Sequence, residues 1–200
     1  MADSPSRSTV RDISYIAVFT ALIIVFAFVT IPGAAGVPIV LQNAIVVLAG
    51  LVLGGRRGFY TAGLFLLIGM LGLPVLAGGR STLAALAGPT IGYLFGYLCS
   101  AFIAGVIAYK ARPRNKSNLV MAVSFGAFVG LLAQYLLGAI GLWLRGDMGF
   151  GEAIVIHGTF LPLDALKFAA AAAIAVGVHS AFPDIMAEEK RRREPSHTTI

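Results

Sequence analysis

Residues 158–175 read GTFLPLDALKFAAAAAIA, an apolar stretch that nevertheless contains Asp164 and Lys167. It overlaps an apolar run, 161–182, of the roughly 17–25 residues that a helix needs to cross a bilayer. A charge inside a membrane costs from about 3 kcal/mol upward, so such residues usually face the interior of a helical bundle and mark a function. Spacing of i, i+3 places the two side chains on one helix face, where they can pair. An ion pair that only fixes the helix in place is the alternative.

The composition of the whole chain agrees with a membrane location. Of its 200 residues 58% are hydrophobic and 12% charged, and the mean hydropathy is +0.88; soluble domains carry about a quarter charged residues. The sequence therefore predicts an all-α integral membrane protein. We expect a six-helix transmembrane domain over 13–182, between an N-terminal segment 1–12 and a basic tail 183–200. The expected spans are 13–30, 39–53, 58–76, 88–109, 118–144 and 161–182.

The basic residues test this count of six. With six spans, 12 of the 15 lysines and arginines fall on one side, in the N-terminal segment, GGRRG (54–58), KARPRNKS (110–117) and the tail. The opposite side receives only Arg80 and Arg145. The run 39–53 is short, but the alternation requires it. Because positive loops stay in the cytoplasm, both termini are predicted to be cytoplasmic. The net charge of +6 then reflects topology and attraction to anionic lipid rather than nucleic-acid binding.

Several polar residues are predicted to lie near the outer end of the bundle with the Asp164–Lys167 pair. Leu161-Pro162 is expected to begin the last helix, since proline is tolerated in the first turn. The outer segment LAGGRSTLAALAGPTIGY (76–93) supplies Arg80, Thr90 and Tyr93. A carboxylate accepts N–H bonds and cations bind carbonyl or carboxylate oxygens, so these groups could hold a small polar solute.

Other polar positions leave two interpretations open. Gln42, near the outer end of the second span, could contact a ligand or bond a neighbouring helix, the commoner role of a membrane amide. Gln134 and Tyr135 are ambiguous in the same way. His157 is expected to be an interfacial or capping group, and no second histidine at ligand spacing predicts a metal site.

The sequence lacks the short motifs of the common hydrolytic sites. It contains no GxxxxGK[ST], no GxSxG and no HExxH. We therefore expect a protein that is not an enzyme and holds no cofactor, and any energy from hydrolysis must come from another polypeptide.

Three stretches together resemble the BioY family, the biotin-specific substrate-binding (S) components of energy-coupling factor (ECF) transporters. They are VPIVLQNAIVVLAGLVLG (37–54), GLPVLAGGRSTLAALAGPTIGYLFGY (72–97) and GTFLPLDALKFAAAAAIA (158–175). The resemblance implies a six-helix, multi-pass protein of a prokaryotic cell membrane that binds biotin from outside, under the loops that follow the first and third helices. It also implies that Asp164 and Lys167 lie in the pocket. Together with the polar residues considered above, the predicted substrate-binding residues are Asp164, Lys167, Arg80, Gln42, Thr90 and Tyr93.

The resemblance further implies partners: a membrane T component and two cytosolic ATPases. In the family an alanine pair on the first helix meets the T component, and Ala17-Val-Phe-Thr-Ala21 fits that pattern; packing inside the bundle is the alternative. The rival hypothesis for function is a stand-alone, proton-linked carrier in which Asp164 takes up protons.

Overall fold

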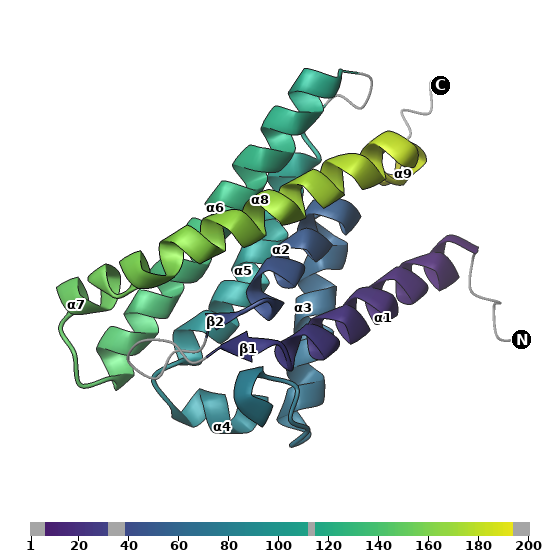
Figure 1. Cartoon of the computed structure of the whole chain (residues 1–200). Coiled ribbons are helices and arrows are strands. Elements are labelled where there is room, and N and C mark those ends of the chain that lie inside the picture. The colour runs from purple at the N-terminus through teal and green to yellow at the C-terminus, as the bar shows by residue number, and fades with distance from the viewer. Residues whose placement is uncertain (1–6, 32–38, 112–114, 194–200) are drawn as a thin grey trace, which may run out of the picture.

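The computed structural model describes residues 7–31, 39–111 and 115–193, which form an almost entirely helical bundle (Figure 1). The prediction of an all-α protein is confirmed at this level. Two-residue strands β1 and β2 pair antiparallel, Thr30 with Val40 and Ile31 with Ile39. The elements are α1 Arg7–Ala27, β1 Thr30–Ile31, β2 Ile39–Val40, α2 Gln42–Leu53, α3 Gly55–Met70, the 3-10 turn η2 Ala77–Gly79, α4 Thr82–Ala87, α5 Ile91–Ala108, α6 Lys116–Arg145, α7 Phe150–Val155, α8 His157–Ala181 and α9 Asp184–Arg193.

Helix α5 is central, because it packs against α2, α3 and α6. Small residues allow this close approach. A Cβ at Gly50 would overlap the backbone of Ala101, and one at Gly92 would overlap the carbonyl of Leu137. The apolar core next to α2 includes Leu51, which is fully buried.

Among the described residues, four helical segments are long and apolar enough to cross a membrane: Thr9–Ala27, Ile91–Ala108, Lys116–Arg145 and Phe150–Ala181. Gln42–Leu53 is a shorter apolar helix of 12 residues. Helix α3 stops at Met70, before the expected boundary at residue 76, because the chain turns at Gly72 with a φ of 91°.

The last long helix begins earlier than the sequence suggested. Helix α8 starts at His157 and contains Pro162 in its interior, so the expectation that Leu161-Pro162 opens the helix is wrong. The short helix α7 precedes it. Asp164 and Lys167 consequently lie in the second and third turns of α8 rather than at its start.

Charged side chains join the two ends of the chain. Arg57 Nη2 lies 2.8 Å from Asp12 Oδ1 and 3.3 Å from Glu189 Oε2, which ties α3 to α1 and α9. Arg11 pairs with Glu188 in the same region. Residues 184–193 of the predicted tail thus form a helix, α9, which these ion pairs join to α1 and α3.

Helix α4 lies at the end of the bundle opposite to α9 (Figure 1). There Arg145 Nη1 donates a hydrogen bond to the Leu86 carbonyl at 2.9 Å, which fastens α4 to the end of α6. The loop after the first helix, which the resemblance placed over the pocket, includes residues 32–38 and lies outside the described residues.

Candidate ligand-binding site

A cavity lies between β2, α2, α4, α5, α6 and α8. Residues from widely separated parts of the sequence line this cavity. They include every pocket residue predicted from the sequence: Gln42, Arg80, Thr90, Tyr93, Asp164 and Lys167.

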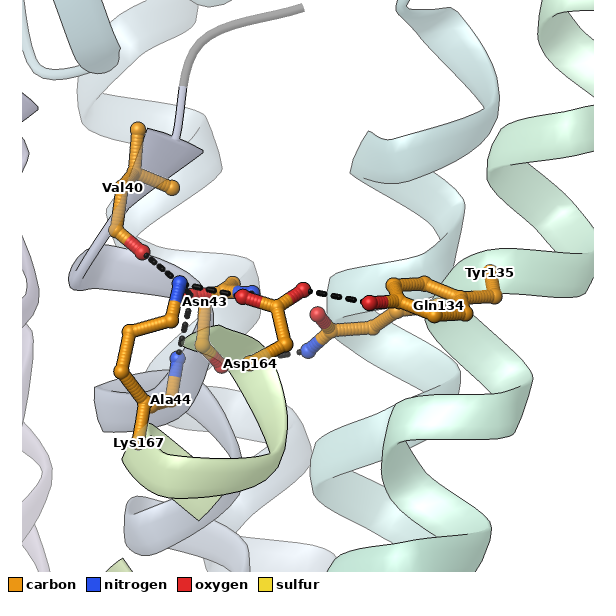
Figure 2. Close-up of polar contacts among 7 residues, drawn as sticks. All are labelled: Val40, Asn43, Ala44, Gln134, Tyr135, Asp164 and Lys167. Carbon is orange, nitrogen blue, oxygen red and sulfur yellow. Dashed lines mark hydrogen bonds and ion pairs between the residues drawn. The ribbon is translucent and has the colours of Figure 1, made fainter. Parts of the chain in front are cut away.

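The Asp164–Lys167 ion pair forms one wall of the cavity (Figure 2). Both side chains are buried, with 4% of Asp164 and 9% of Lys167 exposed. Lys167 Nζ also donates to the Val40 carbonyl at 2.6 Å and to Asn43 Oδ1 at 3.2 Å. The ammonium therefore joins α8 to the strand β2 and to the start of α2, and burial of the pair is offset by hydrogen bonds from both elements.

The second oxygen of Asp164 is held from α6. The Tyr135 hydroxyl donates to Asp164 Oδ2 at 2.8 Å (Figure 2). Next to it, Gln134 Nε2 donates to the Asn43 carbonyl at 3.2 Å and to Ser100 Oγ at 2.9 Å. Gln134 and Tyr135, which were ambiguous in the sequence, both belong to the cavity wall.

Asn43 was not among the predicted site residues, yet it lies at the centre of this network. Its Oδ1 accepts from Lys167, and its Nδ2 lies 3.5 Å from Asp164 Oδ1. The available signal was its position directly after Gln42 at the start of a short apolar run. A neutral amide in such a run does not show which helix it will meet.

Gln42 combines both interpretations left open by the sequence. Its Nε2 donates to the carbonyls of Ile23 at 3.2 Å and Val75 at 2.9 Å, so it bonds neighbouring segments. Its Oε1 is buried without a hydrogen-bond partner, and the residue lines the cavity. Gln42 can therefore still accept a hydrogen bond from a ligand.

The outer segment contributes a cation and hydroxyl groups. Arg80 Nη2 donates to Thr90 Oγ1 at 3.3 Å. The Tyr93 hydroxyl lies 2.8 Å from His157 Nε2. His157 is buried, with 4% exposed, and its Nδ1 lies 2.7 Å from the Ala153 carbonyl in the last turn of α7, which agrees with the expected capping role. The sequence carried no signal for the contact with Tyr93, since 64 residues separate the two side chains.

The two residues predicted to contact a partner, Ala17 and Ala21, do not line the cavity. Ala17 and Ala21 are exposed on α1 and do not pack inside the bundle. Within the described part of the chain, no group of three or more His, Cys, Asp or Glu side chains is placed to hold a metal ion.

The cavity thus offers a carboxylate, two cations and several neutral acceptors beside apolar side chains. Leu76, Leu94 and Phe160 supply part of its apolar surface. A molecule with a polar head that both donates and accepts hydrogen bonds, an apolar body and an anionic group would match these features.

Comparison with known proteins places the chain in a family. Residues 2–184 match the BioY family. The chain is 39% identical over 168 residues to "Biotin transporter BioY" of Rhodobacter capsulatus, covering 78% of this chain and 87% of the relative. It is 36% identical over 179 residues to "Biotin transporter BioY" of Rhizobium etli, covering 86% and 95%.

A solved structure agrees with these sequence matches. The crystal structure of "the S-component for biotin from an ECF-type ABC transporter" superimposes with a TM-score of 0.75 and 28% identity, covering 88% of this chain and 94% of that one. The resemblance seen in the sequence is therefore confirmed, and the chain belongs to the BioY family.

Proposed function

We propose that this chain binds biotin with high affinity and takes it up across the cytoplasmic membrane as the substrate-specificity subunit of an ATP-driven ECF transporter. The named relatives and the solved S-component support biotin as the substrate. The observation that carries the proposal is the buried Asp164–Lys167 pair in the wall of a cavity lined by both polar and apolar side chains.

The chemistry of biotin suits these residues. Its ureido ring offers two N–H donors and one carbonyl acceptor, which match the Asp164 carboxylate and the Lys167 ammonium respectively. Its valerate carboxylate requires a cation, and Arg80 is the candidate. Gln42, Thr90 and Tyr93 complete the polar lining, and the thiophane ring and alkyl chain would lie against the apolar side chains.

The proposed topology has six crossings and cytoplasmic termini, with α2 and α3 as the two short spans. Eleven of the 12 residues of α2 are buried, so this helix is surrounded by protein and need not span the hydrocarbon by its own length. The ion pairs of Arg57 with Asp12 and Glu189 support a common side for GGRRG and both ends of the chain. The positive-inside rule makes that side cytoplasmic.

Coupling to ATP requires partner chains. The exposed Ala17 and Ala21 present a small-residue face on α1, and we propose that the membrane T component packs there, with two cytosolic ATPases beneath it. Close helix packing at small residues is the usual mode of association in membranes.

The test is calorimetric titration of the purified chain with biotin, desthiobiotin and riboflavin. Biotin is expected to bind tightly and riboflavin not at all. Ser180→Ala is a suitable control, because Ser180 is exposed and bonds only the Val176 carbonyl of its own helix. Absence of biotin binding by the wild-type chain would reject the proposal. Uptake without partner chains that stops with an uncoupler but not on ATP depletion would instead indicate the proton-linked carrier.

A further inference from the structure

His157 lies directly behind the aromatic wall of the cavity. Its ring centroid is 5.8 Å from that of Tyr93, 4.5 Å from that of Tyr135 and 6.4 Å from that of Phe160. Those three aromatic residues line the cavity, whereas His157 does not. It can therefore influence a ligand only through the side chains in front of it.

The hydrogen bonds of His157 fix the positions of its protons. Nδ1 lies 2.7 Å from the Ala153 carbonyl, and because a carbonyl oxygen can only accept, Nδ1 carries hydrogen. An imidazolium buried without an ion-pair partner is costly, and in the part of the chain that the structure describes His157 makes no ion pair. In the neutral ring Nε2 is then an acceptor.

The direction of the next hydrogen bond follows. The Tyr93 hydroxyl, 2.8 Å from Nε2, must be the donor. Its proton points to His157, and only its oxygen lone pairs remain for other partners. Gly138 leaves room for the Tyr93 ring in this position, since an added Cβ there would lie 2.5 Å from Tyr93 Cζ.

The neighbouring neutral side chains also donate their hydrogen-bond protons to protein acceptors rather than to the cavity. Tyr135 donates its hydroxyl proton to Asp164. Gln42 uses its amide group on two carbonyls, and Gln134 uses its own on a carbonyl and a hydroxyl. These four side chains of the cavity wall therefore offer oxygen acceptors to a ligand.

We propose that His157 is a positioning residue that turns the Tyr93 hydroxyl into an obligate hydrogen-bond acceptor for an N–H or O–H donor of the ligand. The inference rests on the proposed function, with biotin as the probe. Its mechanism is that Nε2 holds the hydroxyl proton away from the cavity, so a ligand donor meets a lone pair and never a competing O–H.

The experiment is a double-mutant cycle on biotin affinity, measured by calorimetry with His157→Phe, Tyr93→Phe and the double variant. One oriented hydrogen bond is worth about tenfold in the dissociation constant, so each single variant is expected to lose about that factor. Because His157 acts through the hydroxyl, the double variant is expected to lose no more than Tyr93→Phe alone.

Tyr135 supplies the matched control. Its ring packs more closely on His157 than that of Tyr93, but its hydroxyl bonds Asp164. The losses of His157→Phe and Tyr135→Phe should therefore multiply in the combined variant. If the imidazole had a purely structural role, the losses of affinity would combine in the same way with Tyr93→Phe and with Tyr135→Phe.

A conservative variant, His157→Gln, keeps the inference testable if His157→Phe fails to fold. The Oε1 atom of a glutamine reaches close to the place of Nε2, so His157→Gln is expected to stay within about threefold of wild-type affinity. Unchanged affinity in His157→Phe, losses that multiply with Tyr93→Phe, or equal losses in His157→Gln and His157→Phe would each overturn the inference. If the wild-type chain itself fails to bind biotin, the proposed function is rejected as well.

Discussion

Removing both charges of the Asp164–Lys167 pair separates a role in ligand binding from a role in holding helices together. The perturbation is Asp164→Asn combined with Lys167→Met, compared with each single change. Lys167→Met leaves a carboxylate that is 4% exposed without its counter-ion, and loss of one partner of a buried pair costs about 3–5 kcal/mol. Asp164→Asn should lower the free energy of unfolding by less, about 1–3 kcal/mol, because the Lys167 ammonium keeps its hydrogen bonds to the Val40 carbonyl and to Asn43 Oδ1.

The double variant should regain most of this stability. Replacing a buried ion pair by neutral groups of similar volume is often neutral or stabilising, so its unfolding temperature without ligand should return close to that of the wild type. Affinity should not return. Each lost charge-assisted hydrogen bond to biotin is worth about 1.5–3 kcal/mol, or about 10- to 150-fold in the dissociation constant.

The assay pairs thermal unfolding in detergent with calorimetric titration of biotin on the same samples. Recovered stability together with lost biotin binding is the expected combination. A double variant that is stable and binds biotin as the wild type does would refute the reasoning, because the pair would then serve only to hold α8 against β2 and α2.

Three further changes test other parts of the structure. Gly138→Ala should displace the Tyr93 ring, since the new Cβ would lie 2.5 Å from its Cζ, and lower biotin affinity about tenfold. Arg80→Gln should weaken the binding of biotin more than that of biotin methyl ester, in which the carboxylate is neutralised. Equal losses of affinity for the two ligands, measured by calorimetry, would show that Arg80 does not bind the carboxylate. Ala17→Leu with Ala21→Leu should leave biotin binding by the isolated chain unchanged but abolish uptake in cells with the partner subunits; normal uptake would exclude this face as the contact with the T component.

The long elements could be predicted because their physical signal is local. Apolar runs of membrane length correspond to α5 and α6 within three residues at each end, whereas α1 begins six residues before the expected span 13–30. The short helix α2 is also an apolar run, but its length is marginal for a span, and the alternation of basic loops is what favours counting it. The short helix α7 lies in a polar, glycine-containing segment, and that composition does not distinguish a helix from a loop.

Within the site, the charged residues could be predicted from the sequence and the neutral ones could not. Asp164 and Lys167 were visible because a charge in an apolar run is expensive, which restricts where it can lie. His157 and Asn43 are neutral and cost little in the same environment, so their roles depend on partners that only the fold supplies. Asn43 meets a lysine 124 residues away, a relation that a single sequence cannot express.

The hydrogen bonds within the site explain how the buried Asp164 carboxylate has partners without ligand and can still accept a hydrogen bond from one. Asp164 Oδ1 is bound by Lys167 and Oδ2 by Tyr135, so the carboxylate is fixed in orientation by α8 and α6. Asn43 Nδ2 also lies 3.5 Å from Oδ1, and because two carboxylate oxygens have about four acceptor positions, these three contacts leave about one of them for a ligand donor. Because a ligand N–H would add to the existing bonds without displacing the ammonium, little reorganisation is needed, and a preorganised site of this kind favours tight binding.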